Sequence, residues 1–380
     1  MLFAGFASFQ PARWGFWLKL VLTPVIVLAG MIGNTLSLIV MKSKKLRHKS
    51  YSQYLSALSI FDTFTLVIRQ MNVINEYTRE EHHTDIIFQH FDDFGCKLFN
   101  YIEHVSYLMS SWLIVMMSVE RVIAVCMPFK KFRIRKKAGA TLTILALFTT
   151  ICLSQTFRLV MIEQLEPTGC GASNDFLHVY SNLHIYFYYM ALTFVLPVGF
   201  VFVCNGLVLY QIFKVRREII SRVGKRDRHQ RAIRKTHRTT CMLLTVSFTF
   251  LGTLLPLLIL SLVVDCILKA RGPAAFHFYI SVKPFLDLTE VLSLINYAAN
   301  FYIYILSGKN FRYELQRVFN RHKMATRSFT GKSSKDTKEE IIRLWFKYIH
   351  VLMFALCNIK MLYLHKALFV VMIIHKVLFL

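Results

Sequence analysis

The sequence predicts an all-α membrane protein in which seven transmembrane helices form a bundle. The first observation is composition: 55% of the 380 residues are hydrophobic, yet the formal net charge at pH 7 is +25. A membrane protein with basic cytoplasmic loops accounts for both values, whereas a soluble enzyme or a nucleic-acid-binding protein rarely combines them. The second observation is that the apolar runs are continuous rather than alternating, which favours helices over a barrel.

Seven apolar runs are long enough to cross a bilayer, which takes about 20 residues in a helix. They lie at residues 18–42, 52–76, 94–127, 138–162, 182–214, 238–266 and 277–307. Each run is followed by a polar or charged break. We therefore predict that the bundle covers residues 18–307.

The breaks between the runs alternate in charge. Basic breaks follow the first, third and fifth runs, at 42–49, 130–137 and 214–235, and further basic residues follow the seventh run. The other breaks are poor in Lys and Arg and rich in acids. By the positive-inside rule the basic breaks are cytoplasmic, so we predict a plasma-membrane protein with an extracellular N-terminus at 1–17. In isolation 214–238 would also suit a nucleic acid, but in this alternation we expect no nucleic-acid partner.

Beyond residue 321 the sequence is less informative. We expect a cytoplasmic tail at 322–340 and an apolar, basic tail at 341–380. The second tail is punctured by lysines and histidines, so it predicts no eighth span. It is either an element lying in the membrane interface or the product of read-through into non-coding sequence, and we assign it no function.

Signatures of catalysis and of structural metals are missing from the sequence. It contains no P-loop, no GxGxxG after a strand, no HExxH and no GxSxG. The eight cysteines form no CxxC pair, and His82-His83 has no second ligand pair at a useful spacing. We therefore predict that the protein is not an enzyme and has no cofactor.

Polar side chains within the runs are candidates for function, because they are costly in an apolar medium. Asp62 and Ser110 lie in the second and third runs, while Asn296, Asn300 and Tyr304 share one face of a helix in the seventh. A carboxylate, a hydroxyl and two amides would form an oxygen-rich site. Such a site suits either a monovalent cation or a hydrogen-bonded water network, and the spacings alone favour water.

Two further pairs stand at the ends of the third run. Cys96 and Cys170 both lie on the predicted extracellular side, which is oxidising, so we predict a disulfide rather than two free thiols. Glu120 and Arg121 lie at the cytoplasmic edge. They form either an interfacial anchor or a switch, since a buried Arg needs a partner and can change partners.

These residues resemble those of rhodopsin-like (class A) G-protein-coupled receptors over about residues 18–320. Arg121 follows Cys96 by 25 residues, as in the third helix of that family. Further matches are Gly33-Asn34, Leu58 to Asp62, Glu120-Arg121-Val122 for the DRY box, Pro197, Pro256, and Asn300-Phe301-x-x-Tyr304 for NPxxY. The ending NFYIYILSGKNFR is similar to that of invertebrate FMRFamide and myosuppressin receptors. The resemblance also implies a short amphipathic helix eight at 308–321.

The sequence departs from the family pattern at several positions. The usual tryptophan of the fourth helix is missing, and Leu254 stands where the sixth helix usually has an aromatic residue before Pro256. The start of the sixth helix offers no acid to pair with Arg121. Either basal activity is raised or other contacts hold the inactive state, and a degenerate, non-signalling receptor is a further alternative.

Four charged residues in the outer halves of the runs are candidates for ligand binding: Arg69, Glu103, Arg158 and Glu290. By resemblance Glu103 faces the pocket, at the position where amine receptors carry Asp. A small amine or chemosensory ligand would fit a carboxylate there, but the acidic mouth favours a basic neuropeptide, in line with the FMRFamide resemblance. The remaining alternative is that Glu103 or Glu290 pairs with Arg69 and binds no ligand.

The resemblance implies how such a receptor would work. Asp62, Ser110, Asn296 and Asn300 would hold an allosteric sodium ion in the inactive state. Glu120, Arg121, Asn300 and Tyr304 would form the switch that meets a heterotrimeric G protein. A transporter would instead show internal repeats with paired Gly or Pro breaks, and the sequence shows none.

Overall fold

The computed structural model describes most of the chain. The described residues are 13–82, 92–127, 137–165, 169–221, 227–271, 276–307 and 311–318, with the backbone alone at 82, 169, 215–221, 227–243, 269, 271 and 307. The chain divides into two units, residues 1–315 and 316–380, and of the second only 316–318 are described. The predicted segments at 1–12, 130–136, 322–340 and 341–380 therefore lie outside the described residues.

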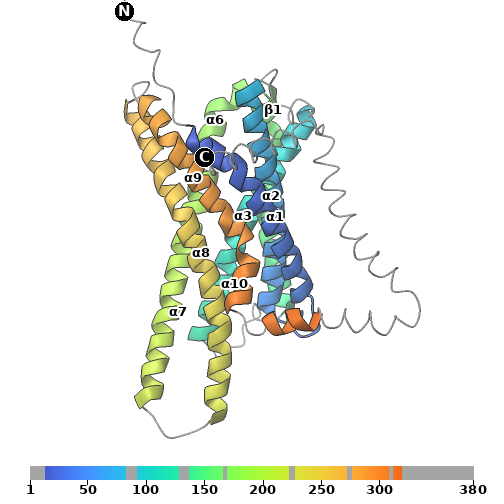
Figure 1. Cartoon of the computed structure of the whole chain (residues 1–380), viewed down its shortest axis with the longest axis vertical. Helices are drawn as coiled ribbons and strands as arrows, with labels where there is room; N and C mark the ends of the chain where they lie inside the picture. Colours follow the sequence, from blue (N-terminus) through green and yellow to red (C-terminus); the bar gives the residue numbers. More distant parts are fainter. Residues whose placement is uncertain are drawn as a thin grey trace, which may run out of the picture. The chain divides into compact units, whose positions relative to one another are not determined.

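Long helices make up most of the described chain (Figure 1). The first three predicted runs form α1 (Trp14–Met41), α2 (Ser50–His82) and α3 (Asp93–Cys126). The fourth forms α4 (Lys137–Ser154) and the short α5 (Arg158–Met161), and the fifth forms the π-helix η4 (Asn182–Val195) and α7 (Leu196–Ser221). The sixth lies in α8 (Asp227–Arg271), and the seventh forms α9 (Phe276–Ala298) and α10 (Asn300–Ser307). The predicted all-α membrane bundle is confirmed.

Six stretches of the described chain are long and apolar enough to cross a membrane. They are Trp14–Met41, Ser50–Glu81, Asp93–Cys126, Lys137–Met161, Asn174–Lys214 and Leu244–Leu268. The seventh predicted span, α9 with α10, is more polar, because α9 carries Lys283, Asp287 and Glu290. Ionisable side chains in such a helix need partners inside the bundle.

The fourth predicted run agrees with the apolar stretch Lys137–Met161, but it is not one continuous helix. That run was expected to continue to residue 162, but α4 ends at Ser154 and residues from Ile162 form strand β1 (Ile162–Leu165). Strand β1 pairs in an antiparallel register with β2 (Gly169–Ala172), and a 3-10 turn η3 (Asn174–Phe176) and α6 (Leu177–Ser181) follow. A short apolar segment fits a helix or a strand equally well, so hydropathy alone could not find this boundary.

The fifth span changes its helical geometry next to a proline. Pro197, near the start of α7, has no N–H and its ring crowds the carbonyl four residues earlier. Before it, the chain forms the π-helix η4, in which the hydroxyl of Thr193 donates to the carbonyl of Tyr188, five residues back, at 2.9 Å. The wider turn therefore reorganises the backbone bonds that a proline interrupts.

Helix α1 packs closely against both α2 and α9. A Cβ atom at Gly15 would lie 2.3 Å from the carbonyl oxygen of Pro284, and one at Gly33 would lie 2.9 Å from Cβ of Phe301. Only glycine permits these approaches, which is a common way for membrane helices to pack. The close contact places the outer part of α1 directly beside the charged residues of α9.

A further helix at 311–318 follows α10. Phe311 is buried, and its ring lies 5.8 Å from that of Phe301 and 5.6 Å from that of Tyr304. Nη1 of Arg312 donates to the carbonyls of Ile305 and Leu306, both at 2.8 Å. These bonds satisfy carbonyls at the end of α10 that have no partner within the helix.

Candidate ligand pocket and switch site

Asp62 of α2 is the centre of a fully buried polar cluster. Its Oδ1 accepts a hydrogen bond from Oγ of Ser110 on α3 at 2.5 Å, and its Oδ2 accepts one from Nδ2 of Asn300 at 2.6 Å. We call these three residues the Asp62 cluster. An ionised carboxylate has about four acceptor positions, and the two donors leave acceptor capacity for water or a monovalent cation.

The backbone bend between α9 and α10 places Asn300 at this cluster. Asn34 of α1 donates from Nδ2 to the carbonyl of Tyr297 at 3.2 Å. In an unbroken helix that carbonyl would accept from the N–H of Phe301. The helix bends at Ala299 even though Phe301 stands where the family pattern has proline, and the amide of Asn34 donates to a carbonyl beside this bend.

Asn296 and Tyr304 lie four residues before and after Asn300, and their contacts differ. Asn296 is buried, and its backbone carbonyl lies 3.4 Å from Nδ2 of Asn300. Tyr304 is fully buried and packs on Phe311, while its hydroxyl makes no hydrogen bond with a described residue. The structure thus joins Asp62, Ser110 and Asn300 directly, and it does not join Tyr304 to them by a hydrogen bond.

Glu120 and Arg121 lie buried at the opposite end of α3 from Cys96. Nη2 of Arg121 lies 3.1 Å from Oε2 of Glu120, and the guanidinium lies 5.8 Å from the ring centroid of Tyr51. The hydroxyl of Ser50 donates to Oε1 of Glu120, which ties the pair to the start of α2. Arg121 is therefore held by its own neighbour and by α2, in an arrangement that could exchange for another partner.

The predicted disulfide between Cys96 and Cys170 is present. It joins the outer end of α3 to strand β2, and the backbone N–H of Gln164 on β1 donates to Oδ1 of Asp93 at 3.2 Å. The hairpin is thus held to α3 by a covalent bond and by a hydrogen bond. It lies at the Cys96 end of α3, away from the Glu120-Arg121 pair.

Arg158 is fully buried, and each of its guanidinium nitrogens has a protein partner. Nε donates to Gln155 at 2.8 Å, Nη1 to Tyr180 at 2.7 Å and to Asn100 at 3.1 Å. Nη2 lies 2.9 Å from Nδ1 of His184. Arg158 was predicted to bind ligand, but these contacts give it a structural task that joins α5, α3, α6 and η4.

A group of ionisable residues lies between α1, α2 and α9, and the sequence had suggested one of its ion pairs, that of Glu290 with Arg69. Nζ of Lys19 lies 2.5 Å from Glu76, 3.0 Å from Glu290 and 3.2 Å from Asp287. Lys283 contacts Glu76 and Asp287, and Arg69 lies 3.3 Å from Glu290. We call this group the outer charge network; its members are Lys19, Arg69, Glu76, Lys283, Asp287 and Glu290. The formal charges of its three cations and three acids sum to zero.

Lys19 is the residue of this network that sequence reasoning missed most clearly. Its side chain is only 6% exposed, although it lies one residue inside the first predicted run, where it was treated as part of an apolar segment. An ionisable residue in a membrane helix indicates a partner inside the bundle, so its presence was an available signal. The identity of its three partners was not available, because they belong to two other helices.

Glu103 of α3 differs from the acids of the network. It is half-buried, and its Oε1 accepts from Nδ2 of Asn72 at 2.6 Å and from the hydroxyl of Tyr107 at 3.0 Å. Within the described side chains it forms no ion pair. Glu103 is therefore a carboxylate that neutral donors hold in place and that has no direct ion pair among the described side chains. Arg69 and Arg158 act on its charge from beyond ion-pair distance.

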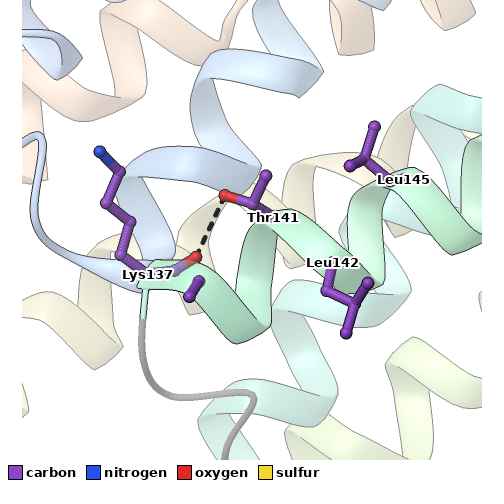
Figure 2. Close-up of a pocket in the computed structure, with 5 residues that line it drawn as sticks. Lys137, Thr141, Leu142 and Leu145 are labelled. Atoms are coloured by element: carbon purple, nitrogen blue, oxygen red, sulfur yellow. Dashed lines mark hydrogen bonds between the residues drawn. The ribbon is translucent and has the colours of Figure 1, made fainter.

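An open groove on the outer surface of α4 is distinct from these sites. It has a volume of about 480 Å³ and is lined by Lys137, Ala138, Thr141, Leu142 and Leu145. Figure 2 shows these side chains and the hydrogen bond of 3.1 Å from Thr141 to the carbonyl of Lys137. None of the predicted site residues lines it. Its apolar surface belongs to a helix that is apolar enough to span a membrane.

Comparison with known families gives one match that covers most of the bundle. The family described as "7 transmembrane receptor (rhodopsin family)" matches residues 33–304. This range contains the Asp62 cluster, Glu103, both cysteines of the disulfide and the Glu120-Arg121 pair. Lys19 lies before its first residue.

Several curated proteins resemble the chain at low identity. Neuropeptide receptor 18 of Caenorhabditis elegans is 24% identical over 324 residues, which cover 78% of this chain and 65% of the relative. The isotocin receptor of Catostomus commersonii is 27% identical over 60% of this chain and 52% of its own length. The FMRFamide receptor of Drosophila melanogaster is 23% identical over 82% of this chain and 55% of its own length. The chain thus matches about half to two thirds of the length of these relatives.

Proposed function

The chain belongs to the rhodopsin family of seven-transmembrane receptors, and from this premise we propose that it is a G-protein-coupled receptor for an extracellular neuropeptide. Relatives named as a neuropeptide receptor and an FMRFamide receptor support a peptide ligand. The ligand class we propose is a basic peptide amide, with Arg-Phe as its C-terminal pair. Membership of a receptor family agrees with the prediction that the protein is not an enzyme.

The observation that carries the ligand proposal is the state of Glu103. Its oxygen is oriented by Asn72 and Tyr107, and it has no cation partner among the described side chains. A guanidinium group can bind such a carboxylate through two parallel hydrogen bonds. Glu290, by contrast, already pairs with Arg69 and Lys19, so we assign the ligand's cation to Glu103.

We propose that the end of the bundle containing Arg121 is cytoplasmic and meets a heterotrimeric G protein. The basic turn at 42–49 leads into α2 beside the buried Glu120-Arg121 pair. At the other end of α1 and α2, Arg13 pairs with Glu80 at 2.9 Å and with Glu81 at 2.8 Å. This charge distribution supports an extracellular N-terminus and a plasma-membrane location.

We further propose that the Asp62 cluster holds a sodium ion in the inactive state. Asp62 would supply the charge, and Ser110 would supply its hydroxyl oxygen beside it. Asn300 would supply its side-chain oxygen, and Asn296, one turn away, would complete the set. Oxygen-only donor sets of this kind suit hard cations. Agonist binding would then release the ion and let α8 and α10 move relative to α3.

The test is a signalling assay on the full chain. Cells expressing it with a promiscuous G protein receive a panel of N-acetylated peptide amides ending in Arg-Phe, and calcium is measured. We expect a response that Glu103→Gln weakens at least about tenfold, as loss of a charged hydrogen bond implies, and that Arg121→Ala abolishes.

A matched control is Glu163→Gln, which removes an acid of strand β1 outside the Asn72–Tyr107 site. It should change potency little. If the protein reaches the cell surface and no peptide of the panel produces a calcium signal, the peptide proposal is contradicted. A response to small amines instead would assign Glu103 to that ligand class.

A further inference from the structure

We propose that Lys19 determines the charge specificity of the ligand pocket by neutralising Glu290. The consequence is that the pocket presents one available carboxylate, Glu103, and prefers a peptide with a single cation near its amidated end over one with two. This inference rests on the proposed function and adds a specificity-determining residue to it. Lys19 acts through Glu290 and is a positioning residue.

Glu290 of α9 is contacted by two cations. The same oxygen, Oε2, lies 3.0 Å from Nζ of Lys19 and 3.3 Å from Nη2 of Arg69. Two cations therefore converge on one carboxylate oxygen. The side chain of Glu290 is about one third exposed, at 32%, and loss of Lys19 would leave Arg69 as the one cation in an ion pair with it among the described residues.

The ammonium group of Lys19 contacts all three acids of the outer charge network and is almost inaccessible. Among the described residues Lys283 forms ion pairs with Glu76 and Asp287 and acts on Glu290 from a greater distance. Arg69 forms an ion pair with Glu290 and also acts on Glu103. Lys19 thus links the group of Lys283, Glu76 and Asp287 to the pair of Arg69 and Glu290. Its removal would leave the three acids of the network with two cations.

The packing of α1 against α9 fixes the position of Lys19. The close approach of Gly15 to Pro284 holds the outer turn of α1 against α9, which brings Lys19 within reach of Asp287 and Glu290. The ammonium is therefore fixed by helix packing and not by a flexible loop.

The experiment uses the full chain and pairs of N-acetylated peptide amides ending in Arg-Phe, which carry either Met or Arg before that Arg. In the wild type we expect the one-cation peptide of each pair to be the more potent. In Lys19→Gln the ratio of potencies should shift by about tenfold towards the two-cation peptide, because an added carboxylate charge at several ångströms has an effect of that order.

Three further variants separate this role from a general effect on folding. Lys19→Gln combined with Glu290→Gln should restore the wild-type ratio, and Lys19→Arg should retain it. Lys283→Gln, the matched control, removes a cation that does not contact Glu290 and should shift the ratio by at most about threefold. If Lys19→Gln fails to reach the surface, Glu290→Gln alone should shift the ratio in the opposite direction, because it leaves an excess cation.

The outcomes are distinguishable. A wild type that responds, with a ratio that Lys19→Gln leaves unchanged or that Lys283→Gln shifts equally, would overturn the role of Lys19 and leave the peptide receptor intact. A surface-expressed wild type that responds to no peptide would overturn the proposed function and this specificity role with it.

Discussion

The outer charge network and the Asp62 cluster solve the problem of buried charge in different ways. The network neutralises three acids with three cations from α1, α2 and α9, and several of its members are about one quarter to one third exposed. The Asp62 cluster holds one fully buried carboxylate with two neutral donors and no cation among the described residues. The network can lose Lys283 and keep Glu76 and Asp287 paired with Lys19, whereas the single carboxylate of Asp62 depends on each of its two donors.

The largest expected effect on stability is at Asn300. Asn300→Ala removes one of the two donors to a buried carboxylate, and hydrogen bonds to charged groups contribute about 1.5–3 kcal/mol. We expect the free energy of unfolding to fall by about 2–3 kcal/mol, measured by thermal unfolding of the purified protein in detergent. The matched control is Asn205→Ala on α7, since Nδ2 of Asn205 is buried without a hydrogen-bond partner among the described residues. Equal losses for the two variants would show that the bond to Asp62 has no special weight.

A smaller effect is expected from sodium. If the Asp62 cluster binds the ion, replacing choline by sodium at constant ionic strength should stabilise the wild type by about 1 kcal/mol once sodium reaches about five times its Kd. Asp62→Asn should remove this dependence, since it removes the charge and keeps the size of the side chain. Thermal unfolding in the two salts measures both. A wild type that does not distinguish sodium from choline would refute the sodium proposal and leave the water network as the content of the site.

The smallest effect is expected in the outer charge network. Lys283 is itself one third exposed, and Lys283→Gln leaves Glu76 and the buried Asp287 paired with Lys19. The free energy of unfolding should therefore fall by only about 0.5 kcal/mol. The loss should shrink further in about 1 M salt, because exposed charges are screened. Lys283→Arg should retain the wild-type stability. A loss as large as that of Asn300→Ala would mean that the network does not re-pair and that the two regions behave alike.

The difference between these two regions also explains which site residues could be predicted from the sequence. Asp62, Ser110 and Asn300 were predicted together because each is a polar residue within an apolar run, and the resemblance gave them a shared role. Their hydrogen bonds agree with that grouping, although Asp62 and Asn300 are 238 residues apart. Arg158 was predicted by the same reasoning, yet its donors are taken by Asn100, Tyr180, His184 and Gln155. A polar residue in a span signals a partner, and the partner can be protein or ligand.

The sequence by itself determined the class of the fold, the approximate helices, the charge of the two ends and the pairing of Cys96 with Cys170. These follow from hydropathy, charge and compartment, which are local properties of the chain. Only the tertiary structure decided that α4 gives way to a hairpin, that the helix bends before Asn300 without a proline, and that Lys19 neutralises Glu290. The physical reason is that these features depend on contacts between distant segments. The approach of α1 to α9 at Gly15 and to α10 at Gly33 sets which side chains meet, and no local pattern encodes those distances.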